Sequence, residues 1–283
     1  MIPTSIQLTI DTGENHIAFT SKKFYHYQIT TEQLAMKPIL GKIAEHKQAY
    51  ANLPLFLYMR DASLTEEARL AFYPCMAHFI LSFGDINKYM LREEPTTDRH
   101  QKRVNIHTYE DDRHWPWYLE DFAKLGFDRL CTPSAWMRFL WSEETRQNRI
   151  LTYRLATLID RASAIERIAI IEAIEETGNV LFSTMLDLAT AIERRRGIEL
   201  RYCGEFHFAL ESGHSAGSDR LEIAEISLDE ATQAHCLLLV DEVFALFEAW
   251  TQELLSYATR KHAHDLDDRY ARLAISNHEI LIK

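Results

Sequence analysis

Histidines and carboxylates recur at helical spacing in one short segment of the chain. His207, Glu211 and His214 stand at positions i, i+4 and i+7, so they share one stripe of a helix at about 100° per residue. Two neutral imidazoles and a carboxylate can bind one metal ion, and this donor set suits iron, manganese or zinc. The alternative is a polar helix face with histidines that are only hydrogen-bonded. Phe206 and Phe208 favour apolar surroundings, in which charged groups need partners.

A second polar set lies earlier in the chain. Glu110 and His114 are four residues apart and share a helix face. His107 and Asp111 fall on or near the same stripe. An acidic first helical turn, favoured by the helix dipole, would account for Asp111 and Asp112. It accounts less well for His114, which has tryptophans close by in the sequence.

A third set consists of Glu172, Glu175 and Glu176, which interrupt the apolar segment 161–195. Apolar residues occur on every face of this segment up to about Leu188, which predicts a central helix. A buried acid must be neutral, paired or bound to a metal, whereas an exposed turn would leave these acids solvated. Metal sites in helical bundles are built from Glu and His on facing helices, so the three sets together favour a metal site.

The run His207-x3-Glu211-x2-His214 resembles the third-helix motif of haem-oxygenase-like diiron oxidases and oxygenases. Those proteins show His-x3-Asp-x2-His there, or Glu in place of Asp. They also carry a Glu and a His on an earlier helix, and another Glu upstream of the final motif. The resemblance covers roughly residues 60–260.

The resemblance implies an all-α domain, a single bundle of about seven helices. It also implies two non-haem iron ions, O2 as co-substrate, and oxidation of a small metabolite such as an amino acid or a fatty acid. No haem is implied. The implied iron ligands are Glu110, His114, Glu176, His207, Glu211 and His214.

Alternatives remain for the acidic ligands that the resemblance implies. The spacing of the earlier Glu–His pair varies in this family, so Asp111 or His107 could replace Glu110. Glu172 or Glu175 could likewise replace Glu176 as the acid between the two motifs.

A serine hydrolase is a rival interpretation, because Gly213-His-Ser215-Ala-Gly217 matches the G-x-S-x-G nucleophile elbow. The elbow requires a buried strand before the serine and a helix after it, whereas residues 205–212 have helical spacing. A strand before Ser215 would favour the hydrolase, and a helix there would count against it.

Two other rivals keep a helical fold without iron. Haem-oxygenase-like proteins include thiamin-degrading hydrolases and cofactor-independent oxidases that need no metal, and metal analysis would separate these from an iron enzyme. A non-catalytic helical binding protein would leave the carboxylates as solvated faces, and its histidines would share no common geometry.

Composition supports a large helical protein. Among 283 residues, 47% are apolar, and only 9 are Gly and 7 Pro, which favours long helices over short strands with tight turns. The net charge of -11 argues against a nucleic-acid partner and leaves a small molecule as the expected one. The cationic run Arg194–Arg196 precedes Gly197, a pattern typical of a helix C-terminus.

The cysteines and the apolar segments indicate the compartment. The four cysteines are scattered without a C-x-x-C pair, which argues against a disulfide framework and a thiolate zinc site. Residues 1–10 lack the pattern of a signal peptide, and no apolar stretch of about 18 residues predicts a membrane span. We therefore expect a cytoplasmic protein that has no membrane partner, and its apolar central helix leaves a homodimer open.

We expect an N-terminal extension over residues 1–30 and a helical domain over 31–283. Alternating apolar residues around a turn-rich patch predict a short β-hairpin within residues 4–20. Helical spacing predicts the following helices: 31–51 with a kink at Pro38, 63–91 capped by Ser63 and kinked near Pro74, 106–125 kinked at Pro116, one opening at Thr132-Pro133, 161–195, 200–216, 228–260 and 265–280.

Overall fold

The computed structural model describes residues 34–128, 132–215 and 218–280, except for the side chains of 211–219 and 261–280. The predicted extension 1–30, with its hairpin, lies outside the described residues. Gln33–Lys283 form one compact unit. The described residues of this unit are mostly helical, as the sequence predicts.

The central helix is α9, which spans Ala164–Arg196. Ser163 and Glu166 form a capping box at its start, in which each side chain bonds the other residue's backbone N–H. Gly197, at φ 65°, ends it in the left-handed conformation, directly after the cationic run Arg194–Arg196. Since residues on every face of α9 are buried, the predicted central helix and its glycine cap are confirmed.

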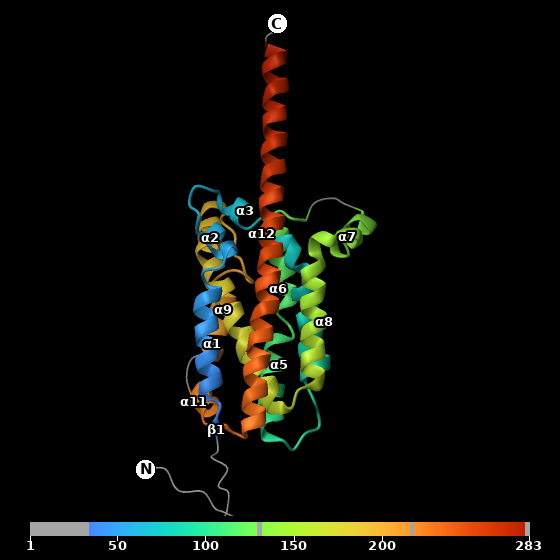
Figure 1. Ribbon diagram of the computed structural model, residues 1–283. Coiled ribbons are helices and arrows are strands. Elements are labelled where there is room, and N and C mark those ends of the chain that lie inside the picture. Colours follow the sequence, from blue (N-terminus) through green and yellow to red (C-terminus); the bar gives the residue numbers. More distant parts are fainter. Residues whose placement is uncertain (1–33, 129–131, 216–217, 281–283) are drawn as a thin grey trace, which may run out of the picture. The chain divides into compact units, whose positions relative to one another are not determined.

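Two long helices pack against α9 and against each other, and a third long helix packs against one of these two. α1 (Lys37–Tyr50) and α12 (Glu230–Ile280) both contact α9 and each other, and α12 also contacts α8 (Arg146–Arg161) (Figure 1). α4 (Ala77–Asp85) packs against α8. The apolar residues that these helices bury against one another form the hydrophobic core.

The predicted helix 106–125 is in fact two helices. α5 spans Arg99–Asp111 and α6 spans Trp115–Lys124, with Pro116 in the first turn of α6. Proline suits a first helical turn because the missing N–H would have no partner inside the helix. The chain therefore turns between the two helices, and this turn carries His114.

Prolines begin helices elsewhere too, at positions where the sequence pattern predicts kinks. Pro38 lies in the first turn of α1, which begins at Lys37 rather than near residue 31. The predicted helix 63–91 is divided into several short elements, and Thr65 rather than Ser63 caps one of them, because its hydroxyl accepts the Ala68 N–H at 3.2 Å. The elements of this region are α2 (Pro54–Arg60), α3 (Glu66–Arg69), the 3-10 helix η1 (Tyr73–Met76), α4 and the π-helix η2 (Ile86–Leu91).

The remaining elements are short. α7 (Pro133–Leu140) is capped by Thr132 as predicted, and a 3-10 turn, η3 (Glu143–Thr145), leads into α8. α10 (Glu205–Ser215) and α11 (Ser218–Ala224) follow α9. Two short antiparallel strands, β1 (Leu34–Ala35) and β2 (Ser227–Leu228), pair before α1 and α12. Within the described ranges, no helix combines the length and apolarity needed to cross a membrane.

Candidate metal centre

α5 and α9 bring a histidine and two carboxylates together. His107 and Asp111 lie one turn apart on α5, and Glu175 faces them from α9. The Nε2 atom of His107 is 3.0 Å from Oδ2 of Asp111 and 3.4 Å from Oε1 of Glu175. One ligand atom from each of the three residues lies within 4.8 Å of the others, so a single metal ion could bind all three.

A pair of histidines adjoins this cluster. Nδ1 of His114, in the turn between α5 and α6, is 3.0 Å from Nε2 of His207 on α10. Two nitrogens that bind one ion at right angles, each at about 2.1 Å, lie about 3 Å apart. The two imidazoles are therefore spaced as neighbouring ligands of one ion would be.

The hydrogen bond of His207 fixes which of its nitrogens can bind a metal. Nδ1 of His207 is 2.8 Å from the carbonyl oxygen of Tyr202. Because a carbonyl only accepts hydrogen bonds, Nδ1 carries the proton and the lone pair stays on Nε2. Metal-binding histidines commonly donate their other ring N–H to a carbonyl or carboxylate in this way.

Asp111 lies between the two groups of ligands. Its Oδ2 faces His107, and its Oδ1 is 3.9 Å from Nδ1 of His114. The Asp111 side chain is 2% exposed, yet Oδ1 has no hydrogen-bond partner among the described residues. Asp111 is also the last residue of α5, where the helix dipole disfavours a negative charge, and not part of the acidic first turn considered above. A bound cation would stabilise a carboxylate oxygen that is buried, lies at a helix C-terminus and accepts no hydrogen bond.

Asp121 holds the loop that presents the Tyr202 carbonyl. Its carboxylate accepts the backbone N–H groups of Arg201, Tyr202 and Cys203 at 2.7, 2.8 and 3.0 Å. Burial, with the Asp121 charge as the next cause, holds the pKa of the Cys203 thiol well above its ordinary value, so the thiol donates to the same carboxylate. Asp121 could not be found from the sequence, because its partners lie 80 to 82 residues further along the chain.

The apolar surroundings of His207 differ from those expected. Phe206 is 42% exposed, so it does not mark a buried helix face. His207, 1% exposed, stacks instead on the Tyr202 ring at 4.8 Å and meets the edge of Phe182 at 4.3 Å. Trp117 stacks on His114 at 4.7 Å. These aromatic side chains shield the imidazole pair from water.

Glu176, the acid expected between the motifs, lies in an ion-pair network. Its Oε2 accepts from Nζ of Lys47 at 2.5 Å and its Oε1 accepts from Nη1 of Arg220 at 3.0 Å. Both oxygens thus have cationic partners. Its neighbour Glu175 is the acid that lies beside His107.

The other acids occupy different places. Glu110 is exposed, whereas its neighbour Asp111 is buried among the histidines. Burial raises the pKa of Glu172, while the positive charge of Arg220 opposes that rise. Glu172 is not among the three residues whose ligand atoms lie within 4.8 Å of one another.

α10 contains all three positions of the motif that begins at His207. Glu211 and His214 belong to this helix, as their spacing predicts, but their side chains lie outside the described residues. The same helix runs to Ser215, where a nucleophile elbow would require a strand. The serine-hydrolase interpretation therefore loses the structural context that it needs.

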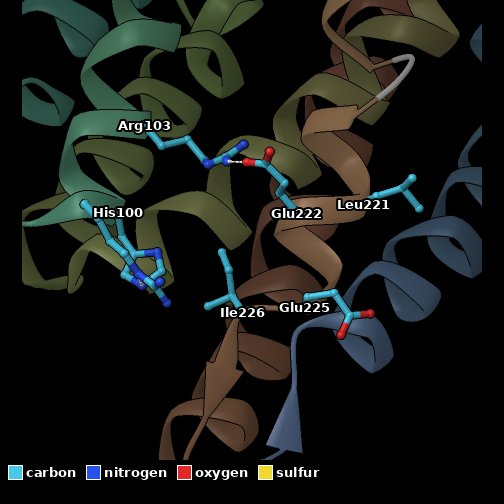
Figure 2. Close-up of a pocket in the computed structure, with 7 residues that line it drawn as sticks. His100, Arg103, Leu221, Glu222, Glu225 and Ile226 are labelled. Atoms are coloured by element: carbon cyan, nitrogen blue, oxygen red, sulfur yellow. Dashed lines mark hydrogen bonds and ion pairs between the residues drawn. The ribbon is translucent and has the colours of Figure 1, made fainter.

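A cleft separate from the histidine cluster lies between α5 and α11 (Figure 2). It measures about 560 Å³, and Arg103 and Glu222 form an ion pair across it at 2.5 Å. Figure 2 shows the Glu225 carboxylate pointing away from this pair. The charged groups of the cleft do not converge on one point, so the histidine cluster is the better candidate for catalysis.

The comparison with solved structures supports the predicted fold. The chain is similar to a domain of unknown function with a heme oxygenase-like fold from Shewanella denitrificans, with a TM-score of 0.57 and 12% identity. The match covers 82% of this chain and 95% of the other. No family model and no curated protein matches the sequence. The chain therefore has an all-α, haem-oxygenase-like fold, which confirms the predicted fold class.

Proposed function

We propose that this protein is a non-haem iron oxidase or oxygenase that uses O2 to oxidise a small molecule at a two-metal centre. One ion would be held by His107, Asp111 and Glu175. The other would be held by His114 and His207, with Asp111 as a bridge between the two. The observation that carries the proposal is the buried Asp111 carboxylate, which has a histidine near each oxygen and no hydrogen-bond partner at Oδ1 among the described residues.

The donor types support iron. The close set holds imidazole nitrogens and carboxylate oxygens, and the nearby Cys203 thiol is protonated and donates to Asp121. Nitrogen and oxygen donors without thiolate suit iron, manganese or zinc, and of these iron is the one that the resemblance implies. Glu211 and His214, which share α10 with His207, would complete the coordination, a role supported by their spacing.

The residues around the centre would orient ligands and exclude water. The Tyr202 carbonyl holds His207 in the tautomer whose Nε2 can bind a metal. The Asp111 and Glu175 carboxylates would offset the charge of two cations in a buried site. Iron bound there would supply the activation of O2 and the oxidising power that the side chains lack.

The first test is an anaerobic titration of metal-free protein with Fe(II). We expect binding of about two irons per chain, followed by a change in visible absorbance when O2 is admitted. Asp111→Asn should weaken the binding of both irons by roughly tenfold or more, because it removes the bridging charge. Glu110→Gln, the exposed neighbour, is the matched variant and should retain iron.

Either alternative outcome is informative. Loss of iron in Glu110→Gln with retention in Asp111→Asn would reverse the assignment of the acidic ligand. Failure of the folded wild-type protein to bind iron would contradict the proposal and favour a metal-free enzyme of the same fold, or a binding protein.

A further inference from the structure

A cavity adjoins the candidate metal centre. Asp111, His114, Glu175 and His207 line one part of it, so a ligand in the cavity would lie beside the proposed metals. Its volume is about 60 Å³. Since about 10–15 Å³ of such space holds one water, a small organic group would fit.

The rest of the wall is apolar. It is formed by side chains from α4, α9 and α12, among them Phe79, Phe83, Leu181, Phe182, Phe247 and Trp250. No lysine or arginine is among the described residues that line the cavity. Lys47 and Arg220, which neutralise Glu176, are not part of the wall.

This lining determines which substrates can enter. On the apolar part of the wall, a free carboxylate would lose its hydration and gain no cationic side chain. An uncharged hydrocarbon group loses nothing by leaving water and gains contacts with the aromatic rings. This part of the wall thus selects against a charged group lying on it.

We infer that the substrate presents an uncharged hydrocarbon group, short alkyl or small aromatic, to the metal centre. This inference rests on the proposed function, and it narrows the substrate class to molecules with an uncharged hydrocarbon part that fits against the apolar wall. A charged group of the substrate does not lie on that wall.

Gly178 provides the means to test the cavity. It lies within α9 on the cavity wall, and a Cβ there would meet only Phe182, at 3.5 Å and 3.8 Å, among the described residues. A larger side chain at this position would therefore occupy the cavity itself. Gly41 is the matched control, because it is exposed within α1 and a Cβ added there would meet no atom of the described residues within 4 Å.

The experiment measures the binding of 1-hexanol and of hexanoate by ligand-observed NMR. Both molecules have the same carbon chain, and only hexanoate is charged. Metal-free protein is used first, followed by protein loaded with Zn(II), which is inert to O2. We expect 1-hexanol to bind both forms, and we expect hexanoate to bind the metal-free form roughly tenfold more weakly than 1-hexanol, or worse.

Gly178→Leu should weaken 1-hexanol binding by roughly tenfold, as expected when about two methylene groups lose their place in the cavity. Gly41→Leu should leave binding unchanged. Gly178→Ala, whose added Cβ fits without any shift, should weaken binding less but in the same direction, and it serves if the leucine variant does not fold.

The outcomes separate this inference from the proposed function. Hexanoate binding to the metal-free protein as tightly as 1-hexanol, or 1-hexanol binding that Gly178→Leu and Gly178→Ala leave unchanged, would overturn the inference even if iron binds. If 1-hexanol binding depends on the cavity but the protein binds no iron, the apolar ligand class stands. Only the proposed oxidase activity is then overturned.

Discussion

Individual residues of the candidate centre are oriented by partners that are not themselves proposed metal ligands. His207 depends on the Tyr202 carbonyl, and Tyr202 depends on Asp121, whose carboxylate accepts several backbone N–H groups of the loop before α10. Because a metal ligand must be oriented as well as present, Asp121 is a positioning residue for the proposed site.

Asp121→Asn should weaken iron binding to the His114–His207 half of the centre by about tenfold to a hundredfold. The asparagine amide offers one acceptor oxygen in place of two. Its NH2 group is only a donor, so it cannot accept a hydrogen bond from the backbone N–H groups that face it. Stability should also fall by about 1–3 kcal/mol because buried N–H groups lose their acceptor. The measurement is an iron titration alongside urea unfolding. Lower stability with unchanged iron affinity would show that Asp121 supports only the fold.

His207→Ala should abolish iron binding at its half of the centre while the helices remain intact. Alanine has no nitrogen that could replace Nε2 of His207, the atom that lies 3.0 Å from Nδ1 of His114. The measurement is the iron content of the variant after metal loading. Circular dichroism checks that the variant is folded. Full iron content in the folded variant would remove His207 from the ligand set.

At the scale of elements, helix ends position the site. α5 ends at Asp111, α6 begins after His114, and α10 begins shortly before His207, so the ligands cluster where helices start and stop. Glu175, by contrast, lies in the middle of α9. A well-formed α9, with fixed ends, is therefore needed to hold Glu175 opposite α5.

The C-terminal end of α9 can be tested through its glycine. Gly197→Ala should destabilise the protein by about 1 kcal/mol, because alanine is strained at φ 65°. Gly41→Ala, within α1 and exposed, should instead stabilise it by up to about 1 kcal/mol through helix propensity. Urea unfolding of both variants measures the contrast. A stabilised Gly197→Ala would contradict the assigned helix end.

For the molecule as a whole, metal binding and folding should be linked. The proposed ligands come from α5, the turn after it, α9 and α10, which an unfolded chain cannot bring together. Fe(II) added anaerobically at about a hundred times its Kd should therefore stabilise the folded state by about 2.7 kcal/mol, seen as a higher Tm. The Asp111→Asn variant should show a much smaller rise in Tm. An equal rise in both would place the bound iron elsewhere.

The sequence by itself determined the fold class, the long central helix with its C-terminal end, and the helical spacing of the motif that begins at His207. These features depend on local patterns: apolar periodicity, capping residues, and the glycine after a cationic last turn. Pro38, Pro74 and Pro116 were assigned wrongly as kinks, because the same residue suits a kink or a first turn, and only the packing of the neighbouring helices decides between them.

Only the tertiary structure decided which acids lie near the histidines. Glu110 and Asp111 are neighbours, as are Glu175 and Glu176, and adjacent helical residues point about 100° apart. Which of the two faces the site depends on how α5 and α9 are rotated against each other, and that rotation is set by contacts between residues far apart in the chain. The cationic partners of Glu176 and the N–H groups held by Asp121 are contacts of this kind.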